Sequence, residues 1–182
     1  MRKNKTFPKT IGRIFVGLTL LAVAGCGYTT GSLLPSQYRT IYIEPFKNRV
    51  GYTTESGREL YVPLLEVKAR EAIINRYLFD GHLRVADQDK ADLVLKGELT
   101  GFERQELRLT DNNDVQEYRI HVIVALSLWD PAEQKNVWTE PSFVGETTYF
   151  VTGPQAKPES SAINDALTDL ARRVVERTIE NW

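Results

Sequence analysis

The sequence predicts an α+β fold in which two helices pack on one face of a mostly antiparallel sheet of four to five strands, forming a two-layer sandwich. Three observations lead to this prediction. Residues 118–128 alternate between apolar and polar side chains, which is typical of a half-buried strand. Residues 62–79 and 160–179 instead place apolar side chains at helical spacing. Because each helix has one apolar face, both can cover the same face of one sheet.

The first expected elements are a short strand and a helix. Residues 39–46 carry β-branched and aromatic side chains at alternate positions, and Pro45 marks the end of this strand. The polar segment 47–57 is predicted as a loop. The helix begins near Pro63, since proline is tolerated only in a first turn, and the Asp-Gly pair at 80–81 ends it. Its apolar face consists of Leu65, Ala69, Ala72, Ile73 and Tyr77.

A short strand at 82–86 precedes the first of three long strands. This first long strand begins near Leu93 and continues less regularly to Leu109. Gly97 and Gly101 predict a bulge or a bend within it.

The other two long strands follow two turn clusters. The cluster at 110–114 leads to the strand at 118–128, and the cluster at 130–136 leads to the strand at 137–151. Pro141 predicts an edge position or a bulge for the last strand, because proline cannot donate to a ladder.

The last element is the helix at 160–179, which Ser160 or Ser161 can cap. Its basic residues Arg172, Arg173 and Arg177 are predicted to lie on its solvated side. Its apolar stripe consists of Ile163, Ala166, Leu167, Leu170, Ala171, Val174, Val175 and Ile179.

The chain is predicted to divide into three parts. Residues 1–25 begin with five basic residues and no acidic one, and continue with an apolar run, as a secretory signal peptide does. Residues 26–38 are rich in Gly, Thr, Ser and Pro and are predicted to form a tether. Residues 39–182 are expected to form one domain.

Cys26 is the only cysteine of the chain and follows Val23-Ala24-Gly25, an apolar residue and two small ones. This is the lipobox pattern of lipoproteins, so we expect cleavage before Cys26 and its acylation, with palmitate among the acyl chains. Two or more acyl chains anchor a protein stably to a membrane. The alternative is a short transmembrane anchor, but the apolar run has about half of the roughly 20 residues that a span needs.

The charge of the chain argues against nucleic acid as a partner. The formal net charge is −1, and removing the five basic residues of 1–25 lowers it to −6. A global attraction to a phosphate backbone is not expected of such a domain. Any contact with an anionic ligand must therefore come from a local basic cluster.

The sequence offers little support for catalysis. His82 and His121 are the only histidines, and their spacing does not match a metal site. Asp87, Asp89 and Asp92 lack the glycine and distal glutamate of a calcium loop and are predicted to form a solvated turn. Nucleophile-elbow, dinucleotide-binding and Walker motifs are absent. We predict a protein that is not an enzyme and that holds no metal or cofactor.

Arg104, Arg108 and Arg119 are the candidate ligand-binding residues. Antiparallel pairing about Asn112 brings Arg108 and Arg119 close together, with Arg104 further from the turn. If the three side chains point the same way, they could hold phosphate groups by charge-assisted hydrogen bonds. The alternative is that they pair with neighbouring carboxylates, namely Glu103, Glu106 and Glu117.

Several short motifs occur together in one order along the chain. They are Cys26-Gly27-Tyr28, Leu34-Pro35, the strand 40–48, the segment Ala91–Leu99, the pair Trp129-Asp130, then Trp138, and a final apolar helix ending in Trp182. In this order the motifs resemble the LptE family of lipopolysaccharide-assembly lipoproteins, and the resemblance covers nearly all of the chain after residue 25.

The resemblance implies an outer-membrane lipoprotein on the periplasmic side that forms a plug-and-barrel complex with the β-barrel translocon LptD. Such a protein sits largely in the barrel lumen, assists barrel assembly and helps to deliver lipopolysaccharide to the outer leaflet. The resemblance also implies a fold of two helices packed on one sheet. Gly27 suits the outer membrane, since it replaces the Asp that commonly signals retention in the inner membrane of enterobacteria.

Two other functions remain open on the sequence. One is a free periplasmic lipid-binding lipoprotein without a barrel partner. The other is a small lipid-anchored hydrolase, which the missing nucleophile motif disfavours.

Overall fold

The computed structural model describes residues 34–50 and 62–180. The expected signal peptide and Cys26 lie outside the described residues. The elements are β1 (Thr40–Ile43), β2 (Lys47–Asn48), α2 (Leu65–Asp80), β3 (Arg84–Val85), a 3₁₀ turn at Gln88–Lys90, β4 (Leu93–Leu109), β5 (Val115–Asp130), β6 (Lys135–Phe150) and α3 (Glu159–Glu180).

The strands form one mixed, six-stranded sheet in the order β3-β1-β4-β5-β6, with β2 also paired to β4. The three long strands pair antiparallel, as the sequence predicts. Three short ladders are parallel, and they join β1 to β3, β1 to β4 and β2 to β4. The sheet exceeds the expected four to five strands because two residues of the segment predicted as a loop form β2.

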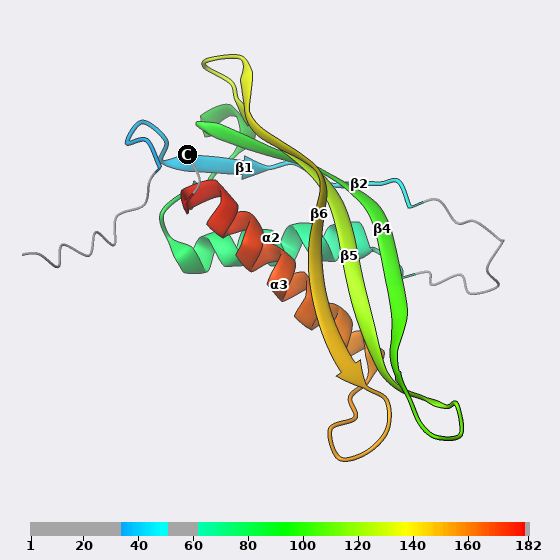
Figure 1. Cartoon of the computed structure of the whole chain (residues 1–182). Coiled ribbons are helices and arrows are strands. Elements are labelled where there is room, and N and C mark those ends of the chain that lie inside the picture. The colour runs from blue at the N-terminus through cyan, green and yellow to red at the C-terminus, as the bar shows by residue number, and fades with distance from the viewer. Residues whose placement is uncertain (1–33, 51–61, 181–182) are drawn as a thin grey trace, which may run out of the picture. The chain divides into compact units, whose positions relative to one another are not determined.

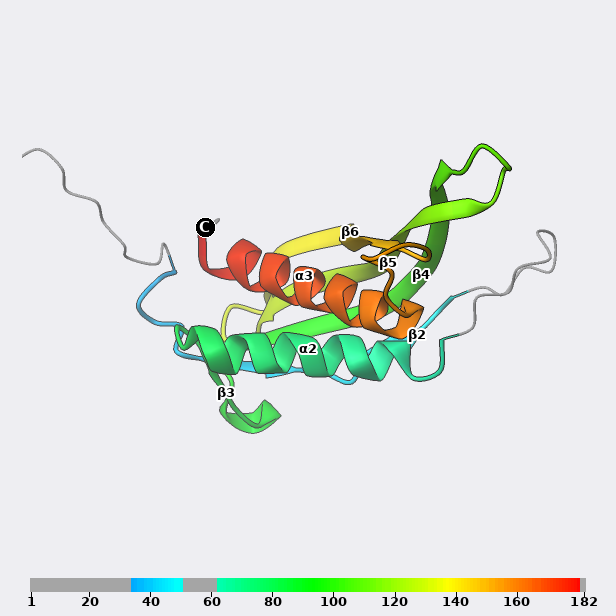
Figure 2. The same cartoon turned by 90° about the horizontal axis from the view of Figure 1, so that it is seen from below.

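Both helices pack on the same face of this sheet, side by side, so the predicted two-layer α+β sandwich is confirmed (Figures 1 and 2). The described helices include none that is long and apolar enough to cross a membrane. All eight predicted apolar positions of α3 are buried, as are four of the five predicted for α2. The fifth, Ala72, is half-buried and lines a groove between the helices.

Two details of the helices differ from the prediction. Helix α2 begins at Leu65, two residues after Pro63, and Leu64 before it adopts a left-handed backbone with φ 56°. Arg172 and Arg173 are exposed, as predicted, but Arg177 is half-buried. The Arg173 guanidinium donates to the backbone of β6, and that of Arg177 lies over a β6 tryptophan and pairs with a β6 glutamate.

Strand irregularities fall where glycine and proline predict them. The register between β4 and β5 shifts between Leu99 and Gly101. Strand β6 is a sheet edge, and its register with β5 also shifts next to Pro141. Gly145 lets α3 approach β6 closely, because a Cβ built there would lie 2.4 Å from the Leu170 Cβ and 2.5 Å from the Ala166 carbonyl oxygen.

The two halves of β4 differ in burial. Most residues from Leu93 to Leu99 are buried, whereas Gln105 to Leu109 are exposed on both faces. The hairpin that joins β4 to β5 therefore extends past the helix layer, as Figure 2 shows. This projecting end carries Arg108 and Arg119, and Arg104 lies at its base.

Candidate functional site: the open face of the sheet

No described helix covers the face of the long strands that points away from α2 and α3 (Figure 2). In β5 every second residue from Ile120 to Asp130 is buried, and the other residues of the strand are half-buried. The residues that alternate with the buried ones are mixed in character: Arg119, His121, Ile123, Ala125, Ser127 and Trp129. The Lys96 ammonium lies 5.1 Å from the centre of the Trp129 ring, so charge also covers the aromatic end of this face.

His121 lies at the centre of this open face, as its place in the alternation predicts. Its Nδ1 is 3.6 Å from a carboxylate oxygen of Glu103 on β4, and its Nε2 is 3.3 Å from one of Glu146 on β6. The three residues are direct neighbours across three strands. When protonated, the imidazole can pair with both carboxylates. No group of three metal-ligating side chains suited to hold an ion occurs within residues 34–50 and 62–180.

Arg108 and Arg119 share the open face near the hairpin turn. Arg108 is directly opposite Glu117, and Arg119 is two positions further along β5 on the same face. Such diagonal neighbours are about 7–8 Å apart. The Arg108 guanidinium is 3.6 Å from the Glu117 carboxylate and lies over the Phe150 ring, yet its side chain is 60% exposed. Arg119 has no ion-pair partner among the described residues.

Arg104 does not join the other two arginines. It is directly opposite Ile120, which is buried in the core, so it lies on the helix-facing side of the sheet. Its guanidinium is 2.9 Å from the Glu159 carboxylate at the start of α3 and lies over the Tyr118 ring. The three arginines therefore do not point the same way. The expected pairing with neighbouring carboxylates holds for Arg108 and Glu117, while Arg104 pairs with a residue of α3.

Exposed apolar side chains accompany these arginines. Leu107 and Leu109 on β4 and Val151 after β6 are all more than one-third exposed. The only sequence signal for them is the loss of regular alternation after Phe102. An end that combines exposed leucines with an exposed guanidinium can contact a molecule that has both acyl chains and phosphates.

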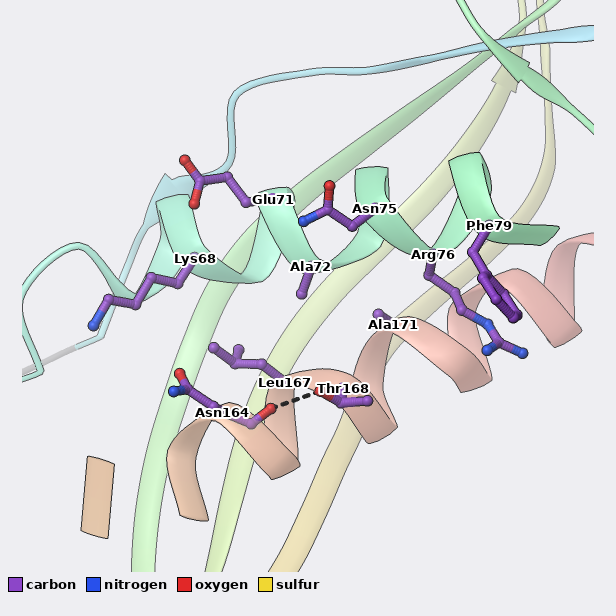
Figure 3. Close-up of a pocket in the computed structure, with 10 residues that line it drawn as sticks. All are labelled: Lys68, Glu71, Ala72, Asn75, Arg76, Phe79, Asn164, Leu167, Thr168 and Ala171. Carbon is purple, nitrogen blue, oxygen red and sulfur yellow. Dashed lines mark hydrogen bonds between the residues drawn. The ribbon is translucent and has the colours of Figure 1, made fainter. Parts of the chain in front are cut away.

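A groove of about 470 Å³ lies between α2 and α3, on the opposite side of the molecule from the open face of the sheet (Figure 3). Its floor contains small and apolar residues, with Ala72 facing Ala171 across the helix pair. Lys68, Glu71 and Arg76 place charges of both signs along its walls. The mixed lining gives this groove no clear preference for one charge.

Asp92, which lies in one of the family-like motifs, has a structural role. Oδ2 of Asp92 accepts hydrogen bonds from the backbone N–H groups of Arg39 and Thr40 and from the Thr40 hydroxyl, at 2.8–2.9 Å. Burial raises the pKa of Asp92, but these hydrogen bonds outweigh it and hold the pKa below its ordinary value. The sequence predicts a solvated turn for Asp92, but its carboxylate instead fixes the start of β1.

The comparison with known folds supports the architecture. The structure resembles the crystal structure of protein XCC0632 from Xanthomonas campestris, with a TM-score of 0.55 and 12% identity over 77% of this chain and 83% of that one. It also resembles the hypothetical protein CT253 from Chlamydia trachomatis, with a TM-score of 0.52 and 15% identity over 77% of this chain and 95% of that one. At these identities the likeness concerns the fold alone.

No curated protein matches the sequence. The sequence does match a family described as lipopolysaccharide-assembly, LptE, over residues 38–178, which includes every strand and nearly all of α3. The chain therefore belongs to the LptE family, and its role lies in lipopolysaccharide assembly.

Proposed function

We propose that this protein is an outer-membrane lipoprotein, acylated on Cys26, whose domain occupies the lumen of an LptD-type β-barrel. There it assists the assembly of the barrel and the delivery of lipopolysaccharide to the outer leaflet. The observation that carries this proposal is the open face of the sheet, which combines charged, polar and small side chains on a rigid three-stranded surface. The inner walls of large membrane barrels are polar, so a mixed polar face can contact them more favourably than an apolar face.

The proposed role is steric rather than catalytic. Both histidines contact carboxylates: His121 lies between Glu103 and Glu146, and Nδ1 of His82 is 2.8 Å from the Asp80 carboxylate. No hydrogen bond joins either ring to a hydroxyl or thiol group among the described residues, as activation of a nucleophile would require. A folded wedge that supports a barrel needs shape and surface complementarity, which the sheet supplies.

Arg108 and Arg119 are the residues that we propose to contact the phosphates of lipopolysaccharide. They share one face, and Arg108 is largely exposed. Arg104 was an equal candidate on sequence, and its ion pair with Glu159 gives it a bracing role between β4 and α3 instead. The nearby Leu107 and Leu109 offer apolar contact for acyl chains.

Affinity purification of the full chain from membranes tests the barrel complex. We expect LptD to co-purify in stable amounts, and we expect depletion of this protein to cause an outer-membrane barrier defect. Ala125→Glu with Ser127→Glu should abolish co-purification, because two new carboxylates would cover the centre of the open face. The matched control is Asn75→Glu with Thr168→Glu, on the helix groove, which should leave it intact.

Two outcomes would contradict the proposal. A monomer that carries bound lipid and no barrel protein would identify a free periplasmic lipid-binding lipoprotein. Loss of LptD from the groove variant but not from the sheet variant would place the contact surface on the helices. Unfolding midpoints of both variants must equal that of the parent chain for either comparison to count.

A further inference from the structure

Strand β6 is the free edge of the long antiparallel sheet, since β5 is its one neighbour in the strand order. Past the irregularity at Pro141, it runs without interruption from Phe143 to Phe150. Such an edge normally presents a row of unpaired N–H and C=O groups, which another chain can extend by adding a strand. Its length makes this edge a strong template for strand addition.

Side chains of helix α3 cover the middle of this edge. In both views the helix runs next to β6, and the two backbones approach most closely at Gly145 (Figures 1 and 2). On either side of Gly145, α3 side chains bond the edge: the Arg173 guanidinium donates to the Val144 carbonyl at 2.5 Å, and Glu146 N–H donates to Asp169 Oδ2 at 3.1 Å. One side chain thus acts as a donor and the other as an acceptor, as a neighbouring strand would.

The chain after β6 occupies the end of the same edge. Lys157 N–H donates to the Phe150 carbonyl at 3.0 Å, and Ala156 forms a parallel bridge with Phe150. The Lys157 ammonium also pairs with Asp165, which ties this returning segment to α3. The bonded edge positions, 144, 146 and 150, are separated by even numbers, as expected of groups that point to one side of a strand.

We propose that Asp169 and Arg173 form an edge guard that prevents a second copy of this chain from adding its own β6 to the sheet. Without the guard, two β6 edges can pair antiparallel about a two-fold axis and join the two sheets, which makes the contact self-complementary. Arg173 also lies over the Phe143 ring, which holds its guanidinium at the edge. The guard keeps the chain monomeric, independently of which barrel or lipid it serves.

The test is sedimentation velocity of the full chain in mild detergent, comparing the parent with Asp169→Ala/Arg173→Ala. The double variant has the same net charge as the parent chain, so a change in its association cannot come from net charge. We expect the parent to be monomeric and the double variant to dimerise at least about tenfold more tightly, through the freed edge. The control is Lys68→Ala/Glu71→Ala, which also leaves the net charge unchanged and removes two side chains that line the groove between the helices.

A third substitution identifies the surface through which the variant associates. Thr148→Pro in the double-alanine background should restore the monomer, because proline removes an edge N–H and is tolerated on an edge strand. A monomeric double variant that is folded by circular dichroism would overturn the proposal. So would dimers that persist with Thr148→Pro, because they would form elsewhere.

Amide exchange in the parent chain tests the guard without any variant. The Glu146 amide, which donates to Asp169, should exchange slowly, whereas the edge-facing Thr148 amide, without a partner among the described residues, should exchange fast. Equal fast exchange at both positions would show that the guard contact does not hold in solution, and would refute the proposal even if the variants failed to fold.

Discussion

The Tyr38 hydroxyl donates a 2.6 Å hydrogen bond to Oδ2 of Asp130, 92 residues further along the chain. The other carboxylate oxygen of Asp130 accepts from the N–H groups of Ala132 and Glu133, which shape the turn between β5 and β6. Asp130 is 1% exposed. One buried carboxylate therefore ties the segment before β1 to the turn between β5 and β6.

Tyr38→Phe should destabilise the domain by about 1–3 kcal/mol, because it leaves a buried carboxylate with one hydrogen bond fewer. The free energy of unfolding from urea titration at pH 7 measures the loss. Tyr42→Phe is the control, since Tyr42 is half-buried and no partner of its hydroxyl is recorded among the described residues. Equal stability of the two variants would show that the Tyr38 bond adds nothing.

The stability loss of Tyr38→Phe should also depend on pH. Burial raises the pKa of Asp130, but the hydrogen bonds from Tyr38, Glu133 and Ala132 outweigh it and lower the pKa below its ordinary value. A lowered folded pKa adds stability above the unfolded pKa, near 4, and this stability is lost as the pH falls through the folded value. The deficit of Tyr38→Phe should therefore be full at pH 7 and should shrink below about pH 4. A deficit that stays constant down to pH 3 would exclude the carboxylate as its source.

Gly145→Ala should destabilise the domain by about 1–3 kcal/mol, the usual cost of overpacking. The new methyl group would lie 2.5 Å from the Ala166 carbonyl oxygen, and helix backbone cannot move aside as a side chain can. Gly101→Ala is the matched control, because its Cβ would meet the flexible end of Ile123 at 3.1 Å. Thermal unfolding of both variants checks the ranking, and a greater loss for Gly101→Ala would contradict it.

The long elements were predictable because each is long enough for its apolar period to dominate. The stripe of α3 and the alternation of β5 both bury one face, and the sequence shows this directly. Strand β3 lies within the predicted short strand at 82–86, whereas β2 was not predicted, since two residues carry no period. Their pairing depends on backbone groups of β1 and β4, which a side-chain pattern does not reveal.

The candidate site was only partly predictable. The turn at 110–114 correctly brought Arg108 and Arg119 to one end of a hairpin. The side of the sheet on which Arg104 lies depends on register shifts near Gly101 and near Arg108, and a shift of one residue reverses a side chain. The edge contacts of Asp169 and Arg173 depend on how α3 crosses β6, which follows from tertiary packing rather than from either segment alone.

Leu64→Gly should stabilise the domain by about 0.5–1 kcal/mol. Leu64 has φ 56° and ψ 29°, a left-handed conformation that costs a residue with a Cβ roughly 1–2 kcal/mol. Glycine avoids this cost but loses more backbone entropy on folding, about 0.5–1 kcal/mol. The side chain is 62% exposed, so little burial is lost. Leu64→Ala keeps a Cβ and should show no gain in urea unfolding; an equal gain would show that backbone strain is not the cause.

Cys26→Ser should abolish the proposed acylation of the protein. This prediction does not depend on whether the protein contacts a barrel. Mass spectrometry of the amino terminus should then show no added acyl mass, and metabolic labelling with palmitate should fail. Gly25→Ala is the control, because it keeps a small residue before the cysteine and should remain acylated. Unmodified Cys26 in the parent chain would contradict the lipoprotein assignment.

Arg108→Gln with Arg119→Gln should weaken binding of purified lipopolysaccharide about tenfold or more. Hydrogen bonds to charged groups contribute about 1.5–3 kcal/mol each, and 1.4 kcal/mol corresponds to a factor of ten. The loss should be largest at low salt, because exposed charges are screened as ionic strength rises. Arg39→Gln with Arg84→Gln removes the same charge from two exposed positions, one just before β1 and one on β3, where the Arg84 N–H donates to the Arg39 carbonyl. If both double variants weaken binding equally, the effect is one of net charge alone. If Arg108→Gln/Arg119→Gln binds lipopolysaccharide as tightly as the parent chain, Arg108 and Arg119 do not contact its phosphates.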